Sequence, residues 1–250
     1  MRETHLIMGM PIEIEVVGDT SQPAIEDAFA YLAAVDERFS TYKDTSEIAA
    51  INSGSATAVE ASEEMQEVFA LAEKTRNETR GFFNICRPDG RLDPSGIVKG
   101  WAVLNAARRI AAAGHAHFFI NAGGDVATSG KNARGEDWVV GVRNPFNPEE
   151  VVKRICPQGK GVATSGSYLR GAHIYNPHNS SQLLDEMVSI TIIGPDVLEA
   201  DRYATAAFAM GREGVFFIES LPGFEAYAID RRGVATMTSG FEEYTKTCQC

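Results

Sequence analysis

Near the N-terminus, apolar and polar residues alternate along the chain. Between Pro11 and Val17, isoleucine and valine alternate with Glu13 and Glu15, and this period of two predicts a half-buried strand. A helical period follows, and it predicts helices over residues 21–39, 44–51, 62–79 and 97–113. Residues 81–96 contain prolines, glycines and charges that break the helical period, so we expect a loop there.

The second half of the chain is dominated by short apolar runs that glycine and proline separate. These runs predict strands over residues 117–121, 126–129, 138–142, 151–156, 188–193, 226–229 and 234–238. Two further helices are expected, one that contains Asp201 and ends at Gly211, and one over residues 214–221. Helices and strands are mixed without regular βαβ alternation, which predicts an α+β fold. No linker or repeat divides the chain, so we expect one domain over residues 1–250 with a short C-terminal tail.

Composition and charge exclude several classes of protein. Hydrophobic residues make up 44% of the chain and charged residues 23%, which is ordinary for a globular protein. The net charge of -11 argues against a nucleic-acid partner, and no apolar stretch is long enough for membrane insertion. No signal peptide or lipobox is recognised, so we expect a cytoplasmic protein unless a leader was trimmed. The four cysteines lack paired CxxC spacing and do not indicate a zinc site.

Asp201 and Thr205 are the strongest candidates for metal binding. They lie four residues apart in a predicted helix, so both side chains project from one face, one turn apart. A carboxylate and a hydroxyl are hard oxygen ligands that suit Mg²⁺ better than zinc. Two structural alternatives remain open at this point. Asp201 could cap the helix, and Thr205 could bond to the backbone of its own helix.

Two apparent phosphate-binding loops do not satisfy their motifs. Residues 125–132 lack the first glycine and the final Ser or Thr of a Walker loop. Residues 159–161 lack the third glycine of a dinucleotide-binding fingerprint. The sequence therefore supports neither a Walker NTPase nor a Rossmann enzyme.

Other segments rich in small residues could contact a phosphate. Asp93, Gly96 and Lys99 lie at the start of a predicted helix, where free N–H groups favour anions. Residues 163–170 combine hydroxyl groups with a guanidinium that suits phosphate. His173 adds an imidazole that titrates near neutral pH.

An ordered set of short segments extends from Met8 to about Gly233. The segments are Met8-Gly9-Met10, Phe39-Ser40-Thr41-Tyr42, Ser46-Glu47-Ile48, residues 93–100, Gly123-Gly124-Asp125, Thr164-Ser165-Gly166, residues 173–177 and residues 200–205. Together and in this order they resemble the ApbE family, the FAD:protein FMN transferases. The resemblance implies one α+β domain with a mixed, largely antiparallel sheet that helices flank.

The resemblance also implies a reaction. FAD is the substrate, and Mg²⁺ is the cofactor, with Mn²⁺ as a possible substitute. The hydroxyl of a Thr or Ser in an acceptor flavoprotein attacks the FMN-side phosphorus of FAD, AMP leaves, and FMN stays attached through a phosphoester. The acceptor is expected to carry a segment similar to Ser/Thr-Gly-Ala-Thr.

The residues that match the family motifs are expected to take the corresponding roles. Asp201 and Thr205 would bind the metal through their side chains, and Gly96 through its carbonyl. Contacts to the flavin nucleotide are expected from Met8, Tyr42, Phe82, Phe83, Asn84, Asp93, Lys99 and Ile174. His173 is the candidate base for the acceptor hydroxyl, and Asp201 competes for that role. Core filling by Met8, ordinary packing of Tyr42 and a structural role for His173 are the alternatives.

The chain departs from the family pattern at several positions. Met10 stands where the family usually has Thr, and Asn84, Leu104 and Asn176 stand where it usually has Asp. The segment between Gly81 and Asp93 is also shorter than in many members and lacks their Trp-Gly loop. Two other functions therefore remain open, a metal-dependent FAD pyrophosphatase that yields FMN and AMP, and a non-catalytic FAD-binding protein.

Overall fold

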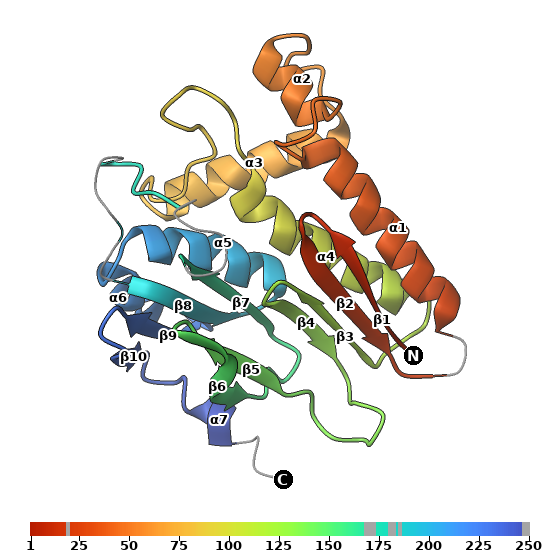
Figure 1. Cartoon of the computed structure of the whole chain (residues 1–250), viewed down its shortest axis with the longest axis vertical. Coiled ribbons are helices and arrows are strands. Elements are labelled where there is room, and N and C mark those ends of the chain that lie inside the picture. The colour runs from red at the N-terminus through yellow and green to blue at the C-terminus, as the bar shows by residue number, and fades with distance from the viewer. Residues whose placement is uncertain (19–20, 168–173, 180–183, 185–186, 247–250) are drawn as a thin grey trace.

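An antiparallel sheet of eight strands forms the centre of the protein (Figure 1). The structure is a computed structural model that describes residues 1–18, 21–167, 174–179, 184 and 187–246. In spatial order the strands are β1 (Arg2–Ile7), β2 (Met10–Val16), β3 (Phe118–Ala122), β4 (Asp125–Ser129), β7 (Gly161–Gly166), β8 (Met187–Gly194), β9 (Glu225–Asp230) and β10 (Ala235–Met237). A separate antiparallel ribbon consists of β5 (Val140–Asn144) and β6 (Asn147–Ile155).

Helices cover one face of the sheet, and the β5–β6 ribbon covers the other. The helices of the first face are α1 (Gln22–Phe39), α2 (Glu47–Ser53), α3 (Glu63–Glu78), α4 (Ser95–Ala112), α5 (Val197–Ala209) and α6 (Glu213–Glu219). The short helix α7 (Glu243–Lys246) packs against β6 of the ribbon. Side chains of successive residues in a strand pack alternately against the helices and against the ribbon. Ala163 packs in the cluster under α5 and α6, whereas Val162 packs in the cluster with the ribbon, as expected when successive side chains point to opposite faces. Among the described residues, no helix combines the length and the apolar character needed to cross a bilayer.

Helices α4 and α5 cross closely, which brings distant parts of the sequence together (Figure 1). At Gly100 an added Cβ would lie 2.7 Å from Asp201 Cβ and 2.9 Å from the carbonyl oxygen of Val197. At Gly96 it would lie 3.2 Å from both Phe83 and Thr205 side-chain carbons. At Gly100 only a residue without a side chain leaves room for this approach, whereas at Gly96 the neighbouring side chains would have to shift slightly. The crossing therefore fixes the distance between the start of α4 and the middle of α5.

The α+β class is confirmed, and every described ladder of the sheet is antiparallel. The predicted helices are present, although α4 begins at Ser95, inside the segment expected to be a loop. Two strands were not predicted. Residues 2–7 form the edge strand β1, and residues 161–166, part of which we expected in a loop, form the interior strand β7.

Candidate active site

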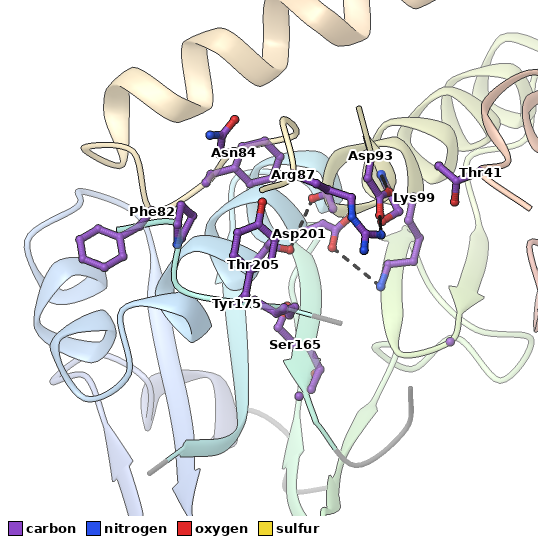
Figure 2. Close-up of a pocket in the computed structure, with 18 of the residues that line it drawn as sticks. Thr41, Phe82, Asn84, Arg87, Asp93, Lys99, Ser165, Tyr175, Asp201 and Thr205 are labelled. Atoms are coloured by element: carbon purple, nitrogen blue, oxygen red, sulfur yellow. Dashed lines mark hydrogen bonds and ion pairs between the residues drawn. The ribbon is translucent and has the colours of Figure 1, made fainter. Parts of the chain in front are cut away.

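Asp201 is a buried link between α5 and α4. The cap of α5 is Asp196, whose carboxylate accepts a hydrogen bond from the Glu199 N–H at 2.9 Å, so Asp201 is not the cap. Asp201 Oδ2 accepts a hydrogen bond from the Gly100 N–H at 2.8 Å. Its Oδ1 lies 3.8 Å from Lys99 Nζ, and Figure 2 shows this contact as a dashed line.

Thr205 and Gly96 place two more oxygens next to this carboxylate. The Thr205 hydroxyl donates to the Gly96 carbonyl at 3.4 Å, which is long for an O–H···O hydrogen bond. The regular helical donor to that carbonyl is the Gly100 N–H, which also bonds to Asp201. The Gly96 oxygen therefore has capacity for a further partner. Two ligands of an octahedral cation at about 2.1 Å are about 3 Å apart, which is close to the observed separation.

Asp125 lies behind Lys99 and is fully buried. Lys99 Nζ lies 2.8 Å from Asp125 Oδ2, while Asp125 Oδ1 accepts a hydrogen bond from the Thr164 N–H at 3.3 Å. The Lys99 contact does not have hydrogen-bond geometry, and the buried Oδ2 has no hydrogen-bond partner among the described residues. Asp125, from β4, thus joins the α4–α5 crossing to the sheet.

The electrostatics of the site follow from this burial. Desolvation, and then the carboxylate of Asp125, raises the pKa of Asp201 to about 8, although Lys99 and the Gly100 N–H favour the ionised form. Two carboxyl groups and one ammonium therefore share a space with little access to water. At neutral pH a carboxyl group with this pKa is largely protonated, and a bound cation would favour its ionised form.

These groups lie at a cavity of about 420 Å³, within the usual range for small-molecule sites. Figure 2 shows Lys99, Asp201 and Thr205 converging from α4 and α5, with Arg87 and Asp93 on the loop that covers them. Among the described residues, the lining consists of Thr41, Tyr42, Phe82, Phe83, Asn84, Arg87, Pro88, Asp93, Ser95, Gly96, Lys99, Gly123, Thr164, Ser165, Gly166, Ile174, Tyr175, Pro177, Asp201 and Thr205.

Most of the residues predicted from the sequence line this cavity, and Met8 is the exception among the described ones. Tyr42 is 96% exposed at the rim, so ordinary packing does not explain it. Met8 is half-buried, packs against the core and is not a lining residue, which favours core filling. His173 lies outside the described residues, so its role stays a prediction. The remaining predicted residues all contribute to the lining: Phe82, Phe83, Asn84, Asp93, Gly96, Lys99, Ile174, Asp201 and Thr205.

The positions that depart from the family pattern have local structural roles. The side-chain oxygen of Asn84 accepts a hydrogen bond from the Cys86 N–H at 2.9 Å, and that of Asn176 accepts one from the His178 N–H at 2.9 Å. Leu104 packs against the core from α4. Met10 is buried, and its sulfur lies against Gly123. At Asn84 and Asn176 the side-chain amide oxygen accepts a backbone hydrogen bond that a carboxylate could also accept.

Sequence reasoning did not assign Asp125, Arg87 or Tyr175 to the site. Asp125 belongs to the Gly-Gly-Asp segment of the family resemblance, which could have indicated a role at the site. Its pairing with Lys99, however, depends on how β4 packs against α4. Arg87 had no motif around it. Tyr175 reaches the loop through its hydroxyl, which donates to the Cys86 carbonyl at 3.2 Å.

The fold is shared with solved flavin transferases. The flavin transferase ApbE from Vibrio cholerae has a TM-score of 0.85 and 21% identity, and the match covers 98% of each chain. The ApbE protein from Thermotoga maritima MSB8 also has a TM-score of 0.85 and 21% identity, over 98% of this chain and 98% of that one. The protein therefore has the fold of these ApbE structures.

The sequence comparison leads to the family. Residues 8–88 and 86–228 match the sequence profile of the ApbE family, and the chain belongs to that family. The FAD:protein FMN transferase of Salmonella typhimurium (strain LT2) is 30% identical over 155 residues, which are 58% of this chain and 44% of that protein. The Escherichia coli (strain K12) protein of the same name is 29% identical over 155 residues, with the same shares. The chain thus spans about half the length of the curated relatives it matches.

Proposed function

We propose that the protein is a FAD:protein FMN transferase that uses Mg²⁺, or Mn²⁺ in its place, to transfer FMN to a Thr or Ser hydroxyl. One observation carries the proposal: the Asp201 carboxylate, the Thr205 hydroxyl and the Gly96 carbonyl lie together at the cavity, beside the Lys99 ammonium. Membership of the ApbE family supports it, as do the names of the Salmonella and Escherichia relatives.

The residues present fit a small divalent cation. Asp201, Thr205 and Gly96 are the proposed ligands, and all three supply hard oxygens. Behind them, the buried Asp125 carboxylate holds the Lys99 ammonium at 2.8 Å. No group of three or more His, Cys, Asp or Glu residues forms a metal site within the described parts of the chain. This favours Mg²⁺, which is usually bound by one or two carboxylates together with substrate phosphates and water.

In the proposed reaction the acceptor hydroxyl oxygen forms a bond to the FMN-side phosphorus of FAD. The bond between that phosphorus and the bridging oxygen breaks, and AMP leaves with the bridging oxygen. A cation bound at this site would neutralise charge on the diphosphate and polarise the attacked phosphoryl group. Lys99, held by Asp125, would place a positive charge beside the phosphate oxygens.

The hydroxyl proton needs an acceptor, and two candidates remain from the sequence. His173 would act as a base near neutral pH. Asp201 lies at the cavity, but a metal ligand that is already bonded to the Gly100 N–H has less capacity to take a proton. We therefore propose His173 as the base and Asp201 as the metal ligand.

Products distinguish the proposed function from its alternatives. The chain is incubated with FAD, Mg²⁺ and a small protein that displays a Ser-Gly-Ala-Thr segment in an exposed loop, and flavin is followed on a denaturing gel. Covalent flavin on the acceptor together with free AMP is the expected result. FMN and AMP without labelled acceptor would instead indicate a pyrophosphatase. Bound FAD that stays intact for hours would indicate a flavin-binding protein without activity.

Three further parts of the proposal rest on the sequence alone. Residues 1–250 are proposed to act as one flavin-transferase domain. The partner is proposed to be an acceptor flavoprotein with a Ser/Thr-Gly-Ala-Thr-like segment. Location in the cytoplasm stays a prediction.

A further inference from the structure

The hairpin loop between α3 and α4 holds Arg87 rigidly at the cavity. Cys86 and Leu92 form an antiparallel bridge, and the Arg87 N–H donates to the Arg91 carbonyl at 2.9 Å. The loop is fixed from outside by Asn52 of α2, whose side-chain amide donates to the Leu92 carbonyl at 2.9 Å and accepts from the Leu92 N–H at 2.7 Å. Little backbone freedom would therefore be lost when the Arg87 side chain binds a ligand.

The guanidinium of Arg87 is only weakly held by its neighbours. Among the described residues, its closest carboxylates are Asp93 at 3.6 Å and Asp89 at 3.9 Å, and both distances exceed a normal hydrogen bond. Each carboxylate already accepts a backbone bond, from the Ser95 N–H at 3.1 Å and from the Arg91 N–H at 3.1 Å respectively. The Arg87 side chain is 51% exposed, so these ion pairs contribute little and the guanidinium can turn to a ligand at small cost.

The charges around the cavity leave a need for a second cation. Among the described lining residues, Lys99 and Arg87 are the positive side chains, and Asp93 and Asp201 are the negative ones. Lys99 is engaged by Asp125 at 2.8 Å and by Asp201 at 3.8 Å. A diphosphate carries one negative charge on each phosphate. A planar guanidinium can bind two oxygens of one phosphate at once, which a lysine ammonium cannot do.

We propose that Arg87 is a substrate-binding residue that contacts the diphosphate of the bound dinucleotide from the loop side of the cavity, opposite Lys99. Figure 2 shows Arg87 reaching down from the loop toward the space between Asp201 and Lys99. Arg87 is not in any of the segments that carry the family resemblance. The diphosphate as ligand rests on the proposed function, whereas the weakly held guanidinium at the cavity is observed independently of it.

Binding measurements on four proteins test this role. The wild type is compared with Arg87→Gln, Arg87→Lys and the control Arg91→Gln, which changes an exposed arginine of the same hairpin that does not line the cavity. Affinity for FAD and for riboflavin is measured by flavin fluorescence, and affinity for inorganic pyrophosphate by calorimetry. Riboflavin has the flavin ring but no phosphate, so it reports on packing alone.

We expect Arg87→Gln to weaken FAD binding roughly 10- to 100-fold, the usual effect of losing hydrogen bonds to a charged group. Riboflavin binding should not change, Arg87→Lys should restore part of the loss, and Arg91→Gln should match the wild type. Unchanged FAD binding in Arg87→Gln, or an equal loss of riboflavin binding, would overturn the proposal.

The pyrophosphate titration separates this inference from the proposed function. If the wild type binds neither flavin, the FMN transferase assignment fails. A loss of pyrophosphate binding in Arg87→Gln would still support the role of Arg87 in that case. Pyrophosphate binding that is absent in the wild type, or equal in all four proteins, would then overturn it.

Discussion

Asp201 and Thr205 show what spacing in a sequence can predict about single residues. Their separation of four positions predicted a shared helix face, and the structure resolves both alternatives. Asp196 caps the helix, and the Thr205 hydroxyl contacts the carbonyl of Gly96 in another helix. Spacing could not predict that Asp125 meets Lys99, because that contact depends on the packing of a strand against a helix.

Replacing Thr205 tests the hydroxyl as a cation ligand. Thr205→Val keeps the shape of the side chain but removes the oxygen, and Thr205→Ser keeps the oxygen. We expect the valine variant to bind Mn²⁺ at least about 10-fold more weakly in the presence of FAD, since loss of an oxygen that supports a metal site commonly costs 10- to 100-fold. The serine variant should stay close to the wild type. Electron paramagnetic resonance of free Mn²⁺ measures both, and equal binding by the valine variant would exclude Thr205 as a ligand.

Asp125→Asn tests the buried carboxylate behind Lys99. Without that charge the Lys99 ammonium still faces the Asp201 carboxylate, 3.8 Å away in the wild type, and would compete with a cation for it. We expect weaker Mn²⁺ binding, while the unfolding midpoint should change less than the affinity because the amide keeps the shape. The same resonance titration, together with urea unfolding, compares the two effects. A variant that loses stability but keeps its Mn²⁺ affinity would show that Asp125 is only structural.

At the scale of elements, burial decides which strands the sequence reveals. β2 alternates between buried and less buried positions, and its pattern was predicted. β1 lies at the sheet edge with most of its residues exposed, so it has no apolar alternation. β7 lies inside the sheet but consists of small residues and hydroxyls, a composition that is typical of loops. Helices that bury one face show the helical period of apolar residues in the sequence, and they were predicted.

Gly100→Ala tests the close crossing of α4 and α5. The new methyl group would meet a backbone oxygen at 2.9 Å and Asp201 Cβ at 2.7 Å, so the helices must separate. Overpacking of this kind costs about 1–3 kcal/mol, although alanine favours helix more than glycine does. Arg108→Ala, at an exposed position of the same helix, is the control. Urea unfolding measures both, and a Gly100→Ala protein as stable as the wild type would contradict the tight crossing.

Arg202 joins α5 to α3 through a buried charge network. Its guanidinium donates to Glu78 at 2.5 Å, to Glu199 at 2.5 Å and 2.9 Å, and to the Thr75 hydroxyl at 3.2 Å. Arg202→Met leaves two carboxylates without this partner. We expect a loss of about 2–3 kcal/mol of unfolding free energy, rather than more, because water reaches both glutamates.

The control for Arg202 is an exposed ion pair. Arg134 is paired with Glu136, and its side chain is 78% exposed, so Arg134→Ala should change stability by less than about 0.5 kcal/mol. Thermal and urea unfolding compare the two variants. An Arg202→Met protein that unfolds with the wild type would show that the network adds no net stability.

At the scale of the whole molecule, the net charge does not show which charged side chains lie at the site. The chain carries a net charge of -11, yet the cavity holds two cationic side chains among its described lining residues. Overall charge argued against a nucleic-acid partner but could not locate these groups. The order of the strands could not be predicted from the hydrophobic pattern either, because β2 pairs with β3, which lies more than a hundred residues away in the sequence. The α+β class itself could be predicted, since it depends on the mixture of elements.

A crystal structure of the protein with FAD and Mn²⁺, with the metal located by anomalous scattering, tests most directly whether Asp201, Thr205 and Gly96 bind the cation. The account predicts an anomalous peak about 2.2 Å from an Asp201 carboxylate oxygen, the Thr205 hydroxyl and the Gly96 carbonyl, with the diphosphate of FAD completing the coordination. A Mn²⁺ ion bound away from Asp201 and Thr205, or FAD bound outside this cavity, would contradict it.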